Sequence, residues 1–415
     1  MPRPCSGRRA RRGCSVCCAR SRIAATCAGS SRRRRVSRAR HDRRGRKRPG
    51  RTVVMKVAVL GAGAIGLATS ATLAAAGHAP SMWSPSGRST TGFGRRKTIT
   101  ATGALSGGWE IDIAETSEQA IRDADAVVLA VDAPGHRPVM EAVAPLLRPG
   151  VPFIIGAAHS LSGLYLSRLL AQRGVVLPIV SWNTTVGTAH RIENGVVDMR
   201  TVRPRIYASV MPSRLADEAL ATCRTLFGDR FERCADALRI ALLSNCNPVF
   251  HVPVCLLNVS RIEHGETWAP YAQTTDSVGR LMEVLDRERI AIGAAFGLPV
   301  HSVNEHFARS FKVPLGSMAE MNALLAERGR GPKGPTTVAH RFLAQDLPFG
   351  LAFAEAAAEI AGVPAPVHQA TLTLAGATLG TDYRAANNLL AVLGLAGRTA
   401  DDLLGLATEG AFGTA

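Results

Sequence analysis

The sequence predicts an α/β fold, in which a domain with a doubly wound parallel sheet is followed by an all-α C-terminal domain. Three observations support this prediction. A glycine-rich turn joins a buried apolar run to a helix of small residues within residues 55–77. Short apolar runs then alternate with helical segments up to about residue 212, which is typical of a parallel sheet with crossover helices. From about residue 213 onwards, apolar residues recur with helical spacing.

The glycine-rich turn reads MKVAVLGAGAIG over residues 55–66, so a buried strand runs directly into Gly61-x-Gly63-x-x-Gly66. With a strand before it and a helix after it, this motif predicts a Rossmann-type dinucleotide site. Gly61 permits the tight turn, Gly63 lets the backbone approach a pyrophosphate, and Gly66 lets helix and strand pack closely. The helix N-terminus then offers free N–H groups to the phosphates. The predicted cofactor-binding residues of this turn are Gly61, Gly63, Ala64, Ile65 and Gly66.

The second strand is expected at about residues 79–83, and the residue at its end selects between the two nicotinamide cofactors. In NAD-specific sites an acid near this point binds the ribose 2′-hydroxyl. Here the position is Ser84, and no acid occurs between residues 78 and 109. Ser84 and Arg88 could instead receive a 2′-phosphate, with further bases at residues 95–97. We therefore expect NADP as the cofactor, with NAD as the alternative if these bases only form a solvated loop.

The alternation of strands and helices continues to the end of the first domain. Two histidines, His136 and His159, follow predicted strands and should lie at the carboxyl ends of the sheet, where ligands bind. Loop histidines without a catalytic role are commoner, so neither is assigned a function. The segments after the second strand are the strand and helix IDIAETSEQAIRDAD, the strand AVVLAVDAPGH, the strand VPFIIGAA, the helix SLSGLYLSRLLAQRG and the strand VVLPIVSW.

Helical segments dominate the second domain, which is expected over residues 213–415 after a nucleotide-binding domain over residues 55–212. The charged residues from Asp286 to Arg289 are expected to form a salt-bridged helix face. The active site should lie in the cleft between the two domains. The predicted helical segments are ADEALATCRTLFG, ALRIALLSN, SVGRLMEVLDRERIAIGAAFG, GLAFAEAAAEIAG and ADDLLGLATEG.

The stretch SNCNPVFHVP, residues 244–253, places polar side chains among apolar neighbours. Polar groups in such a setting need hydrogen-bond partners or a chemical role. An enzyme that transfers hydride to a carbonyl carbon needs a group that supplies or removes a proton, and histidine does this near neutral pH. His251 is therefore a candidate acid/base, and a core histidine with satisfied hydrogen bonds is the alternative.

Three segments of the second half resemble the octopine/nopaline (opine) dehydrogenases, namely NPVFHVPVCLLNVSRIE, LDRERIAIGAAFGLPV and HRFLAQDLPFGLAFAEAAAEIAGVPAP. The resemblance covers residues 55–395 in the same order, and both AVVLAVDAPGH and the Arg191 that follows SWNTTVGTAH fit loosely. The family motif N-P-x-x-H is matched by Asn247, Pro248 and His251.

A second family motif, R-Y-x-x-x-D-[VI]-P-x-G-L, occurs about 90 residues later in this chain. Two positions depart from it, since Phe342 replaces the usual tyrosine and Gln345 replaces the usual glutamate. These departures leave the charged residues of the motif in place. The matching residues are Arg341, Asp346, Pro348, Gly350 and Leu351.

The resemblance implies a role for four residues. His251 and Asp346 would form a catalytic dyad, Arg341 would hold a substrate carboxylate as a buried fork, and Asn247 would also contact the substrate. It also implies the reaction, in which an amino acid and a 2-oxo acid condense to an imine that the cofactor reduces, or the reverse oxidation. Asp346 has a structural alternative as the N-cap of a helix that begins near Pro348. Trp268, Tyr271 and Gln273 are candidates for the side-chain pocket.

Two other functions stay open. Reductases of the 2-hydroxyacid, ketopantoate or glycerol-phosphate type share the two-domain plan but resemble catalysts that use a lysine. This chain has no lysine between Lys97 and Lys312, so the first long stretch of the helical domain cannot supply one. A nucleotide-binding sensor without catalytic activity is the other alternative, to which the departures at Phe342 and Gln345 lend some support.

Residues 1–54 differ in composition from the rest of the chain. They hold 19 of the 50 lysines and arginines, one of the 32 acids and five of the nine cysteines, so the net charge of +18 lies there. They have no apolar periodicity with which to form a core. We expect an upstream extension of the coding frame, with the working protein starting at Met55. A polyanion-binding arm and a targeting segment are the alternatives, and no specific nucleic-acid partner is expected.

The rest of the composition limits the partners. No run approaches the roughly 18 apolar residues of a transmembrane helix, so no membrane partner is expected. The four cysteines after residue 54 show no metal-ligand spacing, so no metal is predicted. They also give no disulfide framework, which favours a reducing cytoplasm. The predicted partners are an amino acid and a 2-oxo acid, and a homodimer is the candidate assembly.

Overall fold

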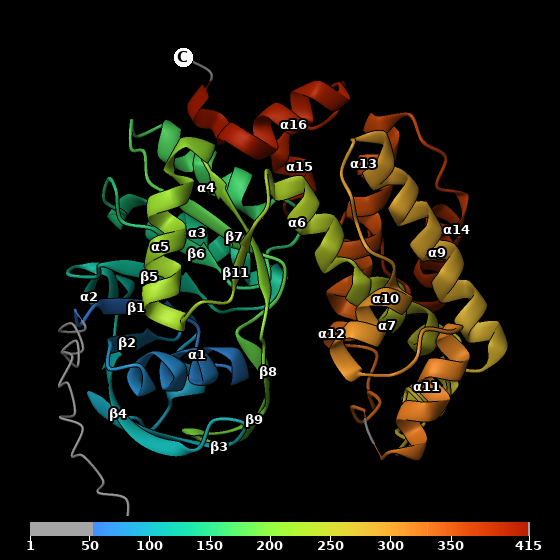
Figure 1. The fold of residues 1–415 in the computed structure, drawn as a ribbon, viewed down its shortest axis with the longest axis horizontal. Coiled ribbons are helices and arrows are strands. Elements are labelled where there is room, and N and C mark those ends of the chain that lie inside the picture. Colours follow the sequence, from blue (N-terminus) through green and yellow to red (C-terminus); the bar gives the residue numbers. More distant parts are fainter. Residues whose placement is uncertain (1–52, 330, 414–415) are drawn as a thin grey trace, which may run out of the picture. The chain divides into compact units, whose positions relative to one another are not determined.

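The computed structural model describes residues 53–329 and 331–413. The segment predicted to be a basic tail, residues 1–54, lies outside the described residues apart from Val53 and Val54. The described body begins with the sheet domain and continues into the helical domain, as the sequence predicts (Figure 1).

The first domain is built on one mixed sheet, in which the described strands follow the order β11-β10-β7-β6-β5-β1-β2-β4-β3-β9-β8. Strands β7 to β4 in this order are parallel, and antiparallel pairs occur where β10 meets β7, where β3 meets β4 and where β8 meets β9. The strands are β1 Lys56–Leu60, β2 Ala79–Trp83, β3 Arg96–Gly103, β4 Gly107–Ala114, β5 Ala126–Leu129, β6 Phe153–Ile155, β7 Ile179–Trp182, β8 Gly187–Glu193, β9 Val196–Val202, β10 Ile206–Met211 and β11 Phe231–Arg233.

Helices cover both faces of this sheet, which confirms the predicted doubly wound fold. Side chains alternate along a strand, so Val57 and Val59 of β1 pack with α1 and α5, whereas Ala58 and Leu60 pack with α2, α3 and α4 (Figure 1). A strand buried on both faces is continuously apolar, as the VAVL run of β1 is. These helices are α1 Ala64–Ala75, α2 Ser117–Ile121, α3 His136–Val143, α4 Ser162–Ala171 and α5 Ala216–Phe227.

The sequence prediction includes the end of β4, as the strand IDIA, but it lacks the two hairpins of the sheet and strands β10 and β11. The hairpins, β3–β4 and β8–β9, fold around α1, whose small residues are buried between them and the parallel strands. The dipeptide Asn194-Gly195 joins β8 to β9, with Gly195 at a φ of 85°. An Asn-Gly pair between two extended segments is a hairpin signal, so the sequence did contain a sign of β8 and β9.

The predicted boundary between residues 212 and 213 is wrong. Helix α5 packs through Cys223 and Leu226 on the face of the sheet that carries Val57, and β11 pairs with β10. Both elements therefore belong to the first domain, and the helical domain begins at α6, Ala237–Ser244. Helical periodicity alone could not reveal this, because a helix that covers a sheet has the same apolar spacing as one in a bundle.

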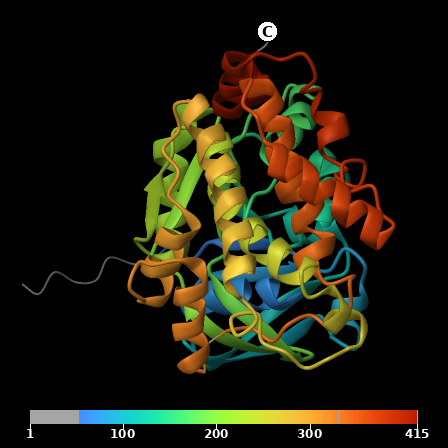
Figure 2. The same ribbon diagram turned by 90° about the vertical axis from the view of Figure 1, so that its right-hand side faces the viewer.

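The second domain is helical, as predicted, and is arranged around α9. Figure 2 shows this long helix running past its neighbours, and α7, α11, α13 and α14 all contact it. After α6 the elements are α7 Cys246–Leu256, α8 Val259–Glu263, α9 Asp276–Ala295, α10 Val303–Phe311, α11 Met318–Glu327, α12 Arg341–Ala344, the π-helical segment η5 Leu347–Ala352, α13 Phe353–Ala361, α14 Pro366–Leu379, α15 Leu390–Leu393 and α16 Ala400–Glu409.

A continuous apolar core joins the two domains. The sheet face that carries α3 and α4 also packs against α6, α13 and α16. The last helix therefore returns to the first domain, where Ala411 donates a backbone hydrogen bond to the Ser167 hydroxyl at 2.9 Å. No helix within the described residues is both long and apolar enough to span a membrane.

The charged run from Asp286 to Arg289 contains a salt bridge, as predicted, but the paired residues Asp286 and Arg289 are buried, whereas Arg287 is exposed. Arg289 is fully buried and donates to the Asp286 carboxylate at 2.7 Å, to the Leu242 carbonyl and to the His301 carbonyl. A buried arginine needs this complete set of acceptors, because desolvating an unpaired charge is costly.

Candidate functional site

The glycine-rich turn between β1 and α1 has the shape that a dinucleotide pyrophosphate requires. Gly61 has a φ of +128°, and a Cβ there would lie 2.4 Å from the Ala130 carbonyl oxygen. A Cβ on Gly66 would lie 2.0 Å from the Gly61 carbonyl oxygen, whereas one on Gly63 would meet nothing within 4 Å. The turn is therefore packed tightly on its inner side and open beside Gly63. No acid stands in the first turn of α1, so its free N–H groups can receive phosphate charge.

Ser84 and Arg88 lie after β2, on the side where the ribose of such a cofactor would extend. Ser84 is buried, and Arg88 is exposed with no ion pair among the described residues. Arg191 of β8 reaches the same place, since its guanidinium donates to the Ser89 carbonyl at 3.1 Å and to the Ala62 carbonyl at 3.4 Å. The sequence placed Arg191 only in a loosely fitting segment.

Of the bases at residues 95–97, Arg96 does not extend this cluster. Arg96 lies on β3 and forms ion pairs with Glu110 and Asp112, both at 3.2 Å. Lys97 lies over the Phe93 ring. The expectation that these bases could help receive a 2′-phosphate is not supported for Arg96, because cross-strand carboxylates already occupy its guanidinium.

His251 and Asp346 come together in the helical domain. His251 lies on α7, Asp346 lies at the junction of α12 with η5, and the His251 Nδ1 to Asp346 Oδ2 distance is 2.7 Å. Asp346 is 1% exposed. The Phe342 ring stacks on the imidazole with 3.6 Å between centroids and 14° between planes. The pair is thus held by a short hydrogen bond and by an aromatic ring that replaces the family's tyrosine.

The environment of His251 sets its proton state. Burial lowers the pKa of His251 below its ordinary value, while the hydrogen bond and the charge of Asp346 raise it and the charge of Arg341 lowers it. The pKa remains lowered, so the ring is neutral at neutral pH. A carboxylate only accepts hydrogen bonds, so Nδ1 carries the proton and Nε2 keeps its lone pair. Among the described residues, nothing hydrogen-bonds to Nε2.

The structural alternative for Asp346 is not supported, because its side chain makes no capping hydrogen bond to the following turn. Its second oxygen, Oδ1, instead accepts from the Gln345 side-chain amide at 3.4 Å, and Gln345 accepts from the Ala133 backbone N–H at 3.1 Å. An amide can donate and accept at once, whereas an ionised glutamate only accepts. Gln345, which replaces the family's glutamate, therefore links the loop after β5 to Asp346.

The remaining motif positions fix the two segments against each other. A Cβ on Gly350 would lie 2.3 Å from the Pro248 ring, so only glycine permits this approach. The Asn245 side chain donates to the Gly350 carbonyl at 3.0 Å. Segment η5 is a π-helix, a form that is frequent at functional sites. These contacts explain why N-P-x-x-H and D-x-P-x-G occur together.

Arg341 lies beside this pair but is exposed, so the expectation of a buried fork is wrong. Its guanidinium lies 5.1 Å from the Phe342 ring centroid and makes no ion pair with any described residue. Burial lowers the pKa of His340, and the Arg341 charge lowers it further. An arginine without a carboxylate partner stays hydrated, because burying its charge alone would be costly.

The residues predicted to contact the substrate or line its pocket lie in different places. Asn247 is exposed on the first turn of α7, four residues before His251 and therefore on the same helix face. Trp268 and Tyr271 are buried in the core of the helical domain, where the Trp268 indole donates to the Pro335 carbonyl. Trp268 and Tyr271 therefore pack inside the helical domain.

The two histidines that follow β5 and β6 differ from each other. His136 begins α3 and bonds to the Ser162 hydroxyl and the Val131 carbonyl, and burial lowers its pKa to about 3. His159 is buried in the loop after β6, and its Nδ1 has no hydrogen-bond partner among the described residues. Burial lowers the pKa of His159, while the charge of Asp346 raises it.

The backbone around His159 is strained. Ala157, Ser160 and Leu161 adopt positive φ values of 64°, 46° and 52°, although none is glycine. The Ser160 hydroxyl donates to the Phe349 carbonyl at 2.9 Å, which ties this loop to η5. Strained loops with an unpaired buried histidine cluster at functional sites. The sequence signal for His159 was its position after a buried strand. That signal alone did not distinguish His159 from an ordinary loop histidine.

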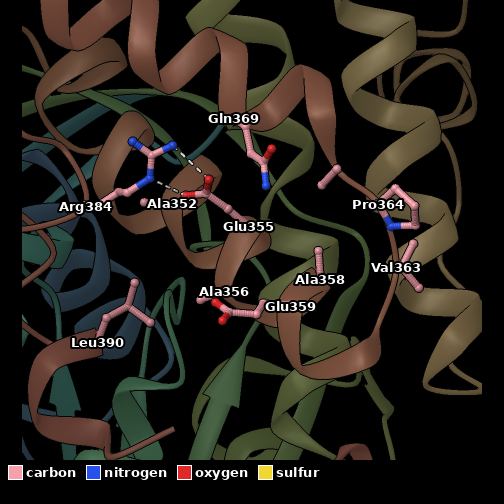
Figure 3. A pocket seen from close by; sticks show the side chains of 11 residues that line it. Ala352, Glu355, Ala356, Ala358, Glu359, Val363, Pro364, Gln369, Arg384 and Leu390 are labelled. Atoms are coloured by element: carbon pink, nitrogen blue, oxygen red, sulfur yellow. Dashed lines mark hydrogen bonds and ion pairs between the residues drawn. The ribbon is translucent and has the colours of Figure 1, made fainter. Parts of the chain in front are cut away.

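A cavity of about 390 Å³ lies elsewhere and is lined mainly by α13 and the connection from α13 to α14 (Figure 3). Neither His251 nor Asp346 lines it. Its most prominent charged groups, Glu355 and Arg384, are joined by two hydrogen bonds of 2.6 and 2.8 Å. Because neither member of the His251–Asp346 pair lines it, we assign the cavity no part in the site.

Comparison with known proteins separates the two halves of the chain. The family described as NAD-dependent glycerol-3-phosphate dehydrogenase N-terminus matches residues 56–170. The family described as NAD/NADP octopine/nopaline dehydrogenase, alpha-helical domain, matches residues 233–379, which include His251 and Asp346.

Individual relatives extend over both halves. An opine dehydrogenase from Arthrobacter sp. (strain 1C) is 29% identical over 352 residues, which cover 83% of this chain and 96% of that protein. A vitopine synthase from Allorhizobium ampelinum is 31% identical over 189 residues, 45% of this chain and 51% of that protein.

Solved structures share the fold. Octopine dehydrogenase with NADH and L-arginine has a TM-score of 0.68 at 18% identity, covering 85% of this chain and 98% of that chain. Yersinopine dehydrogenase with NADP⁺ has a TM-score of 0.63 at 16% identity, covering 85% and 98%. Because the helical-domain match includes the His251–Asp346 pair and the opine dehydrogenase aligns over nearly its full length, the comparisons support the octopine/nopaline (opine) dehydrogenase family and an NAD(P)-dependent oxidoreductase acting on CH–NH bonds.

Proposed function

We propose that this enzyme joins an α-amino acid to a 2-oxo acid by reductive condensation, or runs the reverse oxidation. The observation that carries the proposal is the 2.7 Å hydrogen bond between His251 and a buried Asp346, beside Arg341, which makes no ion pair with the residues that the structure describes. This arrangement provides both a proton carrier and a receptor for substrate carboxylates.

The proposed reaction balances as follows. The amine nitrogen attacks the oxo carbon, water leaves, and a C=N bond forms. The bound nicotinamide cofactor supplies the hydride that reduces the imine carbon, while a proton from solution ends on the nitrogen. The products are a secondary amine with two carboxylates, water and the oxidised cofactor.

His251 would move protons during this sequence through Nε2. Loss of water needs a proton donor at the leaving oxygen, and attack needs a base for the amine proton. Asp346 would hold the ring in one tautomer and stabilise its cation when it forms. Gln345 would in turn hold Asp346, which supports the proposal that the departure from the family motif preserves function.

Arg341 and Asn247 would bind the substrate carboxylates at the open side of the pair. An unpaired guanidinium can form two parallel hydrogen bonds to a carboxylate. Related octopine dehydrogenase structures hold L-arginine or pyruvate, an amino acid and a 2-oxo acid respectively. We extend these two substrate classes, without naming members, to this chain.

We propose NADP rather than NAD as the preferred cofactor. Ser84 stands where NAD-specific sites place an acid, and two arginines, Arg88 and Arg191, lie near it. The glycine-rich turn fits the pyrophosphate of either cofactor. The four described cysteines are free thiols, which supports a cytoplasmic location, and the homodimer stays a prediction that sedimentation would check.

The test follows absorbance of NADPH and NADH while amino acids are paired with pyruvate, oxaloacetate or 2-oxoglutarate. Each oxo acid is also supplied alone. The proposal expects cofactor oxidation only when both substrates are present. Oxidation with an oxo acid alone would favour a 2-hydroxyacid reductase, a candidate that the match of the first domain to a glycerol-3-phosphate dehydrogenase model keeps open. Tight cofactor binding without turnover across the panel would favour the nucleotide sensor.

A further inference from the structure

Three metal-binding side chains meet at the start of α7, outside the site described above. The thiol of Cys246 and one ring nitrogen each of His301 and His306 lie within 4.8 Å of one another. Cys246 is the first residue of α7, His301 lies in the connection between α9 and α10, and His306 lies on α10. Three separate segments of the helical domain therefore converge at one point.

The two imidazoles are free to bind a ligand. Their rings stack with 5.8 Å between centroids and 4° between planes, and neither ring nitrogen has a hydrogen-bond partner among the described residues. Cys246 is 3% exposed, whereas both histidines are half-buried. Unpaired nitrogen donors beside a buried thiol are unusual, because polar groups in such positions normally find partners.

The chemistry of these donors selects the ion. One thiol and two imidazoles suit a borderline-soft cation such as Zn²⁺, whereas Mg²⁺ and Ca²⁺ prefer oxygen ligands. Burial lowers the pKa of His301 to about 4 and that of His306 to about 3, so both rings are neutral, the form that binds metal. Burial raises the pKa of the Cys246 thiol to about 11. A bound cation would have to displace this proton, as coordinating metals do.

Charged groups surround the cluster, and the arginines outnumber the carboxylates. The cations of Arg203, Arg289 and Arg309 act on the histidines, while the carboxylates of Asp286 and Glu305 act on the thiol. A thiolate ligand removes one of the two charges of the ion, so the complex adds only one positive charge. This reduction matters next to Arg289, which is itself paired with Asp286.

We propose that Cys246, His301 and His306 bind one Zn²⁺ ion, with a water molecule as the fourth ligand. The ion would fasten the start of α7, the helix that carries His251, to the connection between α9 and α10. Arg289 already bridges neighbouring segments by donating to the Leu242 and His301 carbonyls, and the metal would add a second bridge. Three protein ligands leave one position open, so the site could also exchange its ion.

Sequence spacing alone did not reveal this site. His301 and His306 are separated by four residues, a spacing that zinc-ligand pairs use, but Cys246 precedes them by more than fifty residues and has no second cysteine at ligand spacing. The sequence prediction considered only the cysteines and therefore expected no metal. The proposal rests on this geometry and is independent of the proposed reaction.

The experiment uses the full chain, treated with a chelator and then titrated with Zn²⁺ or Co²⁺ alone. We expect about one equivalent of Zn²⁺ per chain by elemental analysis, a rise in the thermal unfolding midpoint, and the visible absorption of tetrahedral Co²⁺ with a thiolate ligand. His301→Ala and His306→Ala should each weaken Zn²⁺ binding by at least about 100-fold, more than the loss of an outer-shell partner does.

Controls separate this site from other thiols and histidines. Cys246→Ser should remove the thiolate band of Co²⁺, whereas Cys234→Ser, another buried thiol, and His264→Ala, an exposed histidine, should change nothing. Because residues 1–54 also contain cysteines, Cys17→Ser with Cys18→Ser serves as a further control that should retain the ion. Binding that survives His301→Ala and His306→Ala, or is lost in the Cys17 and Cys18 variant, would overturn the proposal, as would the absence of binding.

Discussion

The two domains of this enzyme differ in whether backbone or side-chain atoms form the functional site. In the sheet domain the backbone carries the function, since Gly61 and Gly66 permit close packing and the open side of Gly63 exposes N–H groups. In the helical domain we propose that side chains carry it, through the hydrogen bond of His251 to Asp346 and the charge of Arg341, which makes no ion pair with the described residues. Backbone sites are reusable between reactions, whereas side-chain constellations are specific to one.

The family matches show the same division. The first half matches a model of glycerol-3-phosphate dehydrogenases, and the second half matches the helical domain of octopine/nopaline dehydrogenases. The glycine-rich turn therefore indicates the class of cofactor, and the helical domain indicates the class of reaction. Changes in the helical domain should alter chemistry without altering cofactor binding, and changes in the turn should do the reverse.

The largest effect is expected from His251→Asn. Replacing the proton carrier should lower kcat by about 10³–10⁴-fold, at the upper end of what general acid–base catalysis contributes. The dissociation constant of NADPH, measured by fluorescence, should stay unchanged, because His251 lies in the other domain. If this variant lost cofactor binding together with activity, the separation of cofactor binding and chemistry between the two domains would be wrong.

Asp346→Asn should lower kcat by about 100-fold, because an orienting carboxylate stabilises the imidazolium without itself contacting the reacting atoms. In the oxidative direction His251 must be neutral to accept a proton, and its pKa is lowered, so activity should fall only below pH 6.5. Asp346 raises that pKa, so removing its charge should move the acid limb to lower pH. A pH profile of kcat/KM that moves to higher pH, or does not move, would contradict this role.

Arg341→Lys should raise the KM of the 2-oxo acid by about 10–100-fold. Lysine keeps the charge but loses the second parallel hydrogen bond, and a hydrogen bond to a charged group contributes about 1.5–3 kcal/mol. Steady-state kinetics would check this, with Arg261→Lys as a matched surface control whose partner is Glu266. Equal KM values for the two variants would remove Arg341 from the site.

Gly63→Ala should weaken NADPH binding by about tenfold while leaving the fold intact, because its Cβ would enter only the space beside the pyrophosphate. Gly66→Ala is the contrasting variant. Its Cβ would lie 2.0 Å from a backbone oxygen, so it should lower the thermal unfolding midpoint as well. If Gly63→Ala unfolded and Gly66→Ala did not, the assignment of the two glycines would be reversed.

The smallest effect is expected from Arg88→Ala. The side chain is exposed, so its contact with a 2′-phosphate is screened, and the preference for NADPH over NADH should fall by about three- to tenfold. The ratio of kcat/KM values for the two cofactors measures this. If the preference for NADPH over NADH did not change, Arg191, which lies closer to the glycine-rich turn, would be the residue that discriminates between the two cofactors.

Local patterns predicted the sheet domain better than the site. The strand expected at residues 79–83 has those bounds, and the turn that follows β1 has the expected conformation. The hydrogen bond between His251 and Asp346 joins residues 95 positions apart, and only the family resemblance paired them. Long-range pairs leave no periodic signal in a single sequence.

The same limit explains what was missed. The hairpin at Asn194-Gly195 did carry a turn signal, but the edge strands around it alternate too weakly to stand out. His159 looked like an ordinary loop histidine, because its strained backbone and missing partner are properties of the folded chain. Arg341 was expected to be buried because its carboxylate partner would come from the substrate, not from the protein.

The most direct test of the central claim is mass spectrometry of the product formed with deuterated NADPH. With an amino acid and a 2-oxo acid present, we expect a secondary amine that contains both carbon skeletons and one deuterium on the former oxo carbon. His251→Asn should form none at comparable times. A deuterated 2-hydroxy acid, with the amino acid recovered unchanged, would contradict the account and assign this site to the reduction of a carbonyl.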